Sequence, residues 1–219
     1  MRMKWMARWG FYLLGLVILA LGIIATTKSQ MGASPIISVA FTASQIWHLN
    51  FGNASLVMYV VIAGIEYLVK GKNFKLYDLL QIPLSILLTR LFNFFGNLLP
   101  DVHNIGASIF FLLIGIVCTG IGASMSMNAR LVPNPGDGIN LALADRTGKN
   151  AGLVKNCIDV FCVSLSVVIC LIATHPTHVV GVGIATVCAM VGVGRVIAVY
   201  NHFFLQKTNE MMGMEAAAA

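Results

Sequence analysis

Ionisable side chains inside apolar stretches are the residues of this sequence best suited to do chemistry. Arg90, Asp159 and Arg195 lie within such stretches, and Asp137 follows a proline at the start of another. Charges are costly in lipid, so such residues are functional candidates. Arg90 and Arg195 would together supply two positive charges to a central cavity, although each side chain could instead extend to the nearest membrane surface. Lys155 precedes Asp159 by four residues, a spacing that lets the two pair on one helical face.

Hydrogen-bonding side chains gather around two prolines. Proline suits the first position of a helix, and serine or asparagine suits the cap before it. Asp137 there either complements the helix dipole or binds a proton or cation. With the ionisable residues, these side chains form one predicted substrate-binding set: Ser34, Pro35, Ser38, Arg90, Asn134, Pro135, Asp137, Asn140, Asp159 and Arg195.

Catalytic signatures do not occur in the sequence. We find no nucleophile–base pair, no carboxylate dyad, no metal-ligand cluster and no ATP-binding motif. His175 and His178 share a short loop, but two histidines lack the further ligands that zinc takes. The five cysteines fall in apolar stretches, where small packing residues are expected. We therefore predict no enzyme activity, no catalytic residue, no bound metal and no cofactor.

The elements that position these residues are membrane-spanning helices. Of the 219 residues, 58% are hydrophobic and 10% are charged, against about 25% charged in soluble domains. Apolar runs approach or reach the ~20 residues that cross a bilayer at 10–27, 54–69, 76–95, 107–125, 157–174 and 179–200. Lipid requires internally satisfied backbone groups, so each run predicts a helix. The sequence thus predicts an all-α membrane protein with about six transmembrane helices.

The net charge of +6 reports orientation rather than nucleic-acid binding. The basic residues lie at predicted helix ends, and no basic surface with interleaved aromatic residues occurs. Basic residues concentrate in cytoplasmic loops. Placing them on that side predicts that both termini are cytoplasmic, with 28–53, 99–104 and 175–178 outside.

An internal repeat organises the chain. A shift of 100 residues aligns the sequence with itself, and about five extra residues in the second copy then bring Arg90 to Arg195. The matching positions are Leu13, Gly15, Val17 and Gly22 with Leu113, Gly115, Val117 and Gly122; Pro35 with Pro135; and Asn50 and Gly52 with Asn150 and Gly152. We therefore expect a first repeat at 1–103, a second at 104–207 and a disordered tail at 208–219.

Each repeat contains one short segment, 35–48 or 135–148, that begins with proline. Their apolar parts are too short to cross a membrane, since a dozen helical residues cover about 18 Å. We interpret both as re-entrant half-helices. Each repeat then has three crossings, and this odd number requires the two repeats to have inverted topology. Half-helices of this kind occur in transporters, where their unpaired N–H groups meet polar groups near the midplane.

These Gly- and Pro-based motifs resemble the YitT/YczE (YyaS-type) family of bacterial integral membrane proteins. The resemblance rests on Gly32-Ala-Ser-Pro35, Asn50-Phe-Gly52, Pro133-Asn-Pro-Gly-Asp137 and Asn150-Ala-Gly152, and covers 10–204. It implies a location in the bacterial cytoplasmic (inner) membrane. It implies no catalytic residues, because members of the family largely lack an assigned activity.

Two functions remain open from the sequence. The first is a secondary transporter or channel-like permease for a small polar solute, anionic or zwitterionic, with a proton or sodium as the coupling ion. The second is a non-transporting membrane subunit that binds a substrate for, or assembles, another membrane complex. The expected partners are the lipid bilayer, the solute and a second copy of the chain in a homodimer, and no nucleic acid.

Overall fold

The computed structural model describes residues 2–174 and 180–212, and in this part of the chain it contains helices and no strands. The helices are α1 (Arg2–Lys28), α2 (Pro35–Ile46), α3 (Phe51–Lys70), α4 (Gln81–Leu98), α5 (Ile105–Asn128), α6 (Pro135–Thr147), α7 (Ala151–Thr174) and α8 (Ile184–Met212). Two short 3₁₀ segments, Gly71–Asn73 and Leu76–Leu80, connect α3 to α4. Six of the helices are long and apolar enough to span a membrane. The predicted all-helical fold with six candidate spans is confirmed.

The two remaining helices, α2 and α6, are short. They have 12 and 13 residues, or about 18–20 Å, against a hydrocarbon core of about 30 Å. Both begin at the prolines identified in the sequence, where the preceding Ser34 and Asn134 have extended backbones. Gly148 ends α6 with a φ of 66°, a left-handed conformation that glycine adopts at low cost.

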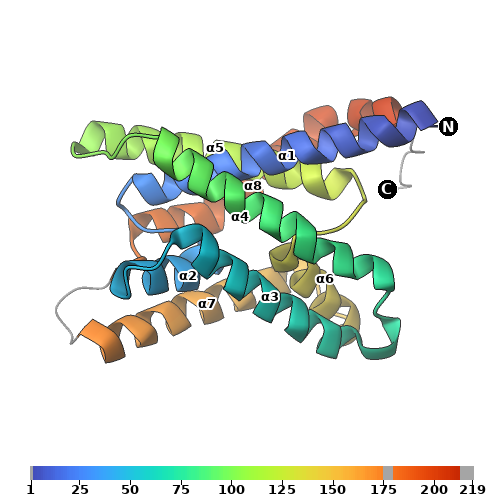
Figure 1. Cartoon of the computed structure of the whole chain (residues 1–219). Helices are drawn as coiled ribbons and strands as arrows, with labels where there is room; N and C mark the ends of the chain where they lie inside the picture. The colour runs from blue at the N-terminus through green and yellow to red at the C-terminus, as the bar shows by residue number, and fades with distance from the viewer. Residues whose placement is uncertain (1, 175–179, 213–219) are drawn as a thin grey trace.

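The helices pack as two groups, each with members from both halves of the sequence (Figure 1). The α1/α5 group comprises α1, α5 and α8, the α3/α7 group comprises α2, α3, α6 and α7, and α4 crosses between the groups and contacts both α1 and α3. In the second group, α2 packs on α7 and α6 packs on α3, so each short helix lies against a long helix of the other half. The groups also contact each other directly where α2 meets α8.

Helices α1 and α5 cross in opposite directions at glycines. A Cβ on Gly22 would lie 2.3 Å from the Thr119 backbone nitrogen, and one on Gly122 would lie 2.3 Å from that of Leu19. From Leu19 to Gly22 along α1, the facing residues on α5 run backwards from Gly122 to Thr119, which makes the pair antiparallel. Because neither glycine has a side chain, the two backbones can approach closely.

Helix α1 lies at the centre of the molecule. In the membrane-spanning stretch of α1, 61% of the residues are buried, whereas the buried fraction is 17% in the corresponding stretches of α7 and α8. Tyr12, Leu16 and Ile24 of α1 pack in one apolar core with Leu88 and Phe92 of α4. The faces of α7 and α8 that remain exposed are available to lipid.

Both ends of the chain differ from the expected boundaries. Helix α1 begins at Arg2 instead of near residue 10, because Trp5, Trp9 and Tyr12 continue it with edge-to-face ring contacts. Helix α8 continues to Met212, past the start of the expected disordered tail at 208, and Thr208 and Met212 are buried. The rest of that tail, and the loop with His175 and His178, lie outside the described residues.

Candidate functional site

A buried cavity of about 90 Å³ lies between the two helix groups, where α2 and α6 begin. We call it the central pocket. Part of its wall is apolar and includes Leu19, Ile23 and Ile197. Its polar lining residues are Ser34, Tyr59, Thr119, Asn134, Asp137, Asn140, Lys155 and Asp159.

The short helices place their first residues at the central pocket. Pro35 and Pro135 occupy the first helical position of α2 and α6, and neither Ser34 nor Asn134 caps its helix with a side-chain hydrogen bond. The polar groups of these two residues are therefore not committed to the helix ends. The Asn134 side chain interacts with the hydroxyl of Tyr59 on α3.

Three ionisable side chains meet at the pocket. Asp159 is 2% exposed and forms an ion pair with Lys155, one helical turn earlier on α7. Lys155 keeps 35% of its side chain exposed. Asp137, in the first turn of α6, lies within electrostatic reach of both. The arrangement offers one ammonium and two carboxylates to a bound ion or solute.

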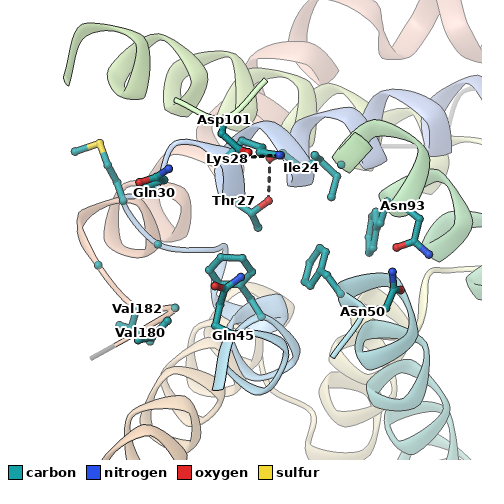
Figure 2. Close-up of a pocket in the computed structure, with 18 of the residues that line it drawn as sticks. Ile24, Thr27, Lys28, Gln30, Gln45, Asn50, Asn93, Asp101, Val180 and Val182 are labelled. Atoms are coloured by element: carbon teal, nitrogen blue, oxygen red, sulfur yellow. Dashed lines mark hydrogen bonds and ion pairs between the residues drawn. The ribbon is translucent and has the colours of Figure 1, made fainter. Parts of the chain in front are cut away.

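A second cavity, of about 870 Å³, is also bordered by both helix groups. We call it the large cavity (Figure 2). Phe41, Phe51 and Phe92 form its apolar side. Five uncharged amide side chains line it: Gln30, Gln45, Asn50, Asn93 and Asn97. Its size lies within the range of small-molecule sites.

An ion pair at the wall of the large cavity joins Lys28, at the end of α1, to Asp101, after α4. The Lys28 Nζ lies 2.6 Å from an Asp101 carboxylate oxygen. The hydrogen bond from Lys28, together with its charge, lowers the pKa of Asp101. The Asp101 carboxylate is therefore charged at neutral pH, and it matches the only lysine in the loops predicted to lie outside.

Six of the ten predicted site residues line the central pocket: Ser34, Pro35, Asn134, Asp137, Asn140 and Asp159. Pro135 lies next to it, at the start of α6. Ser38 is buried away from it, where its Oγ bonds the Pro35 carbonyl at 2.6 Å and the Ser166 Oγ at 2.7 Å.

The predicted arginine pair is not brought to the pocket. Arg90 is exposed and donates to the Asn53 Oδ1 at 3.1 Å. Arg195 is an exposed side chain of α8. Neither arginine lines the central pocket or the large cavity, so the expectation of two central positive charges is corrected.

Sequence reasoning missed Tyr59 and Thr119, and it named Lys155 as a partner for Asp159 without including it among the site residues. The repeat offers a clue to Tyr59, because it is the counterpart of Asp159 at the shift of 100 residues. The large cavity was missed entirely, because its five amides come from four separate segments and share no motif.

Comparison with known proteins agrees with this architecture. Residues 6–202 match the family of unknown function DUF6198. The chain belongs to this family. Over 157 residues it is 29% identical to the uncharacterized membrane protein YczE of Bacillus subtilis (strain 168), a similarity that covers 71% of this chain and 72% of YczE. This agrees with the resemblance seen in the sequence motifs. No solved structure matches the chain. The DUF6198 chain is thus a multi-pass membrane protein of an uncharacterised family.

Proposed function

We propose that this protein is a secondary transporter or channel-like permease for a small polar solute, and that it acts by transport and not by catalysis. The observation that carries the proposal is the pair of cavities between the two helix groups, of which the central pocket lies at the starts of the two short helices. Irregular backbone at membrane depth is tolerated where it lines a polar cavity. Transporters use half-helix starts in this way.

Symmetric contacts support the part of the proposal that the two halves are inverted repeats. Ser38 on α2 bonds Ser166 on α7, and at the shift of 100 residues Gly138 on α6 packs against Glu66 on α3. The antiparallel glycine contacts of α1 with α5 are likewise exchanged by this shift. Helices α1 and α5 are counterparts and run antiparallel, so a twofold axis that exchanges them must reverse the helix direction. A twofold axis in the plane of the membrane does this.

The two helix groups support a mechanism of alternating access. Each group combines helices from both halves, and α4 crosses between the two groups. Rocking one group against the other would close the large cavity at its present mouth. The same movement would open the opposite end, where Lys70, Asp78 and Arg146 line a further cavity of about 490 Å³.

The lining of the large cavity favours a zwitterionic solute over an anionic one. Five amides supply donors and acceptors without net charge, and the Lys28–Asp101 pair supplies both signs. The arginines that motivated an anion are exposed elsewhere. A zwitterion can pair one of its charges with Lys28 and the other with Asp101, whereas an anion can pair only with Lys28 and is repelled by the Asp101 carboxylate.

Flux in proteoliposomes tests the proposal. Reconstituted protein should exchange a radiolabelled small zwitterion, such as glycine or glycine betaine, faster than protein-free vesicles. The double variant Gln45→Leu/Asn97→Leu removes two cavity amides and should lower this flux about tenfold or more, since solute donors and acceptors lose their partners.

Asn156→Leu is the matched control, because Asn156 is exposed on α7 and lines neither cavity. Its flux should equal that of the unaltered chain. Equal flux in the double variant, or no flux of zwitterions, anions or cations above protein-free vesicles, would contradict the proposal.

One observation favours the second candidate, a non-transporting subunit of a membrane complex. Arg195 is exposed eleven residues into α8, about 16 Å along the helix. A charge at that depth is stabilised by a partner chain or by extension to the surface. Co-purification of a stable partner that is lost on Arg195→Leu, with no flux from the isolated chain, would favour this function; a homodimer would satisfy the same arginine.

A further inference from the structure

Three buried oxygens in the central pocket have no hydrogen-bond partner: Thr119 Oγ1, Asn134 Oδ1 and Asn140 Oδ1. Thr119 and Asn140 are each only 8% exposed. Buried polar groups are normally satisfied, and leaving one unpaired costs free energy. Three such atoms around a single cavity point to an occupant that satisfies them.

The charges around these oxygens do not favour an anion. Asp137 and Asp159 contribute two carboxylates, whereas Lys155 contributes one ammonium that is partly exposed and therefore screened. The positive ends of α2 and α6 add about half a charge each. Asp137 lies in the first turn of α6 and offsets the end of its own helix. The pocket has no surplus positive charge to hold an anion.

We propose that the central pocket binds a monovalent metal cation of the size of Na⁺, coordinated by Asp137 and by the oxygens of Thr119, Asn134 and Asn140. Among the described side chains of the pocket, every buried polar atom without a partner is an oxygen. Carboxylate, carbonyl and hydroxyl oxygens are the ligands of hard cations. The cavity, about 90 Å³, leaves room for water to complete the coordination.

A monovalent metal ion fits better than a proton or a divalent ion. A proton bridges two oxygens, so it would leave at least one of the three unpaired. Among the residues that the structure describes, no group of three His, Cys, Asp or Glu side chains is placed to hold a metal. Such a group is what a divalent site would use.

This inference deepens the proposed function, since the ion would couple transport to an ion gradient. Its test needs no solute. The purified full chain in detergent is titrated with NaCl at constant ionic strength, with choline chloride as the replacement salt. Binding of ²²Na⁺ and the unfolding temperature are followed. A ligand that binds the folded state raises the unfolding temperature in a saturable way.

The unaltered chain and Asp145→Asn should show the same saturable Na⁺ binding, because Asp145 is an exposed carboxylate of the same helix. Asp137→Asn should weaken Na⁺ binding about tenfold or more, since it removes a charged ligand. Thr119→Val removes one oxygen without changing charge and should weaken binding less. This variant decides the question if Asp137→Asn does not fold.

The proposal is overturned if the unaltered chain shows no saturable Na⁺ dependence, as expected for a pocket that holds only water or responds only to pH. Unchanged binding in both Asp137→Asn and Thr119→Val overturns it as well. Na⁺ binding without flux of any solute would contradict the transporter and leave the ion site standing. Solute flux that does not depend on Na⁺ would contradict the coupling role of the ion site and leave the transporter standing.

Discussion

Glu66 is a fully buried carboxylate that lies between the Lys70 ammonium and the backbone of α6. Its oxygen lies 2.7 Å from Lys70 Nζ, and Lys70 also contacts Asp78 at 3.1 Å. A Cβ on Gly138 would lie 2.4 Å from Glu66 Oε2, so the backbone of α6 covers the carboxylate. The spacing of four residues lets Glu66 and Lys70 pair on one helical face, but that α6 covers the pair is not visible locally, because α6 is distant in sequence.

Removing Lys70 should therefore lower the free energy of unfolding more than neutralising Glu66 does. Lys70→Met leaves a buried charge without its partner, a change that costs about 3–5 kcal/mol. Glu66→Gln added to Lys70→Met should recover part of this loss. Unfolding in detergent measures each variant, and Lys72→Met, at an exposed lysine nearby, should have no effect. Equal stability of Lys70→Met and Lys72→Met would refute the structural role of the pair.

At the scale of elements, the repeat predicted from glycines has a packing function that the sequence does not state. Gly15, Gly22, Gly115 and Gly122 match at the shift of 100 residues, and in the structure they lie along the crossing of α1 and α5. The two short helices were predicted within one or two residues of their observed ends, because proline and its cap act locally. That α2 packs on α7 and α6 on α3 could not be predicted, because such pairing depends on the shapes of distant surfaces.

Gly22→Ala should separate α1 from α5. Its Cβ would lie 2.3 Å from the Thr119 backbone nitrogen, and backbone cannot yield as a flexible side chain can. We expect a loss of about 1–3 kcal/mol, the range for overpacked sites. The control is Gly64→Ala, with nothing within 4 Å, which should be neutral or stabilising by up to about 1 kcal/mol from helix propensity. Unfolding temperatures in detergent compare the two; a Gly22→Ala protein as stable as Gly64→Ala would speak against close contact.

For the whole molecule, the positive-inside pattern predicts that the loop after α4 lies outside and the loop between α3 and α4 lies inside. A single cysteine replaces either His103 or Asn73, both exposed, in a chain freed of its five cysteines. A membrane-impermeant maleimide should label intact cells at position 103 only, and position 73 only after permeabilisation. The opposite pattern would reverse the orientation and place the large cavity on the cytoplasmic side.

Composition, apolar run length and local helix signals determined the class of this protein, its six candidate spans and the starts of its two short helices, because each depends on neighbouring residues alone. The same local rules placed Asp137, Asn134 and Asp159 at the site, because proline starts and buried charge are visible in sequence. Only the tertiary structure decided that Arg90 and Arg195 face away from the pocket, and that Tyr59, Thr119 and Lys155 face into it. The direction of a side chain depends on how its helix is rotated against its neighbours, and that rotation is set by packing between segments far apart in the chain.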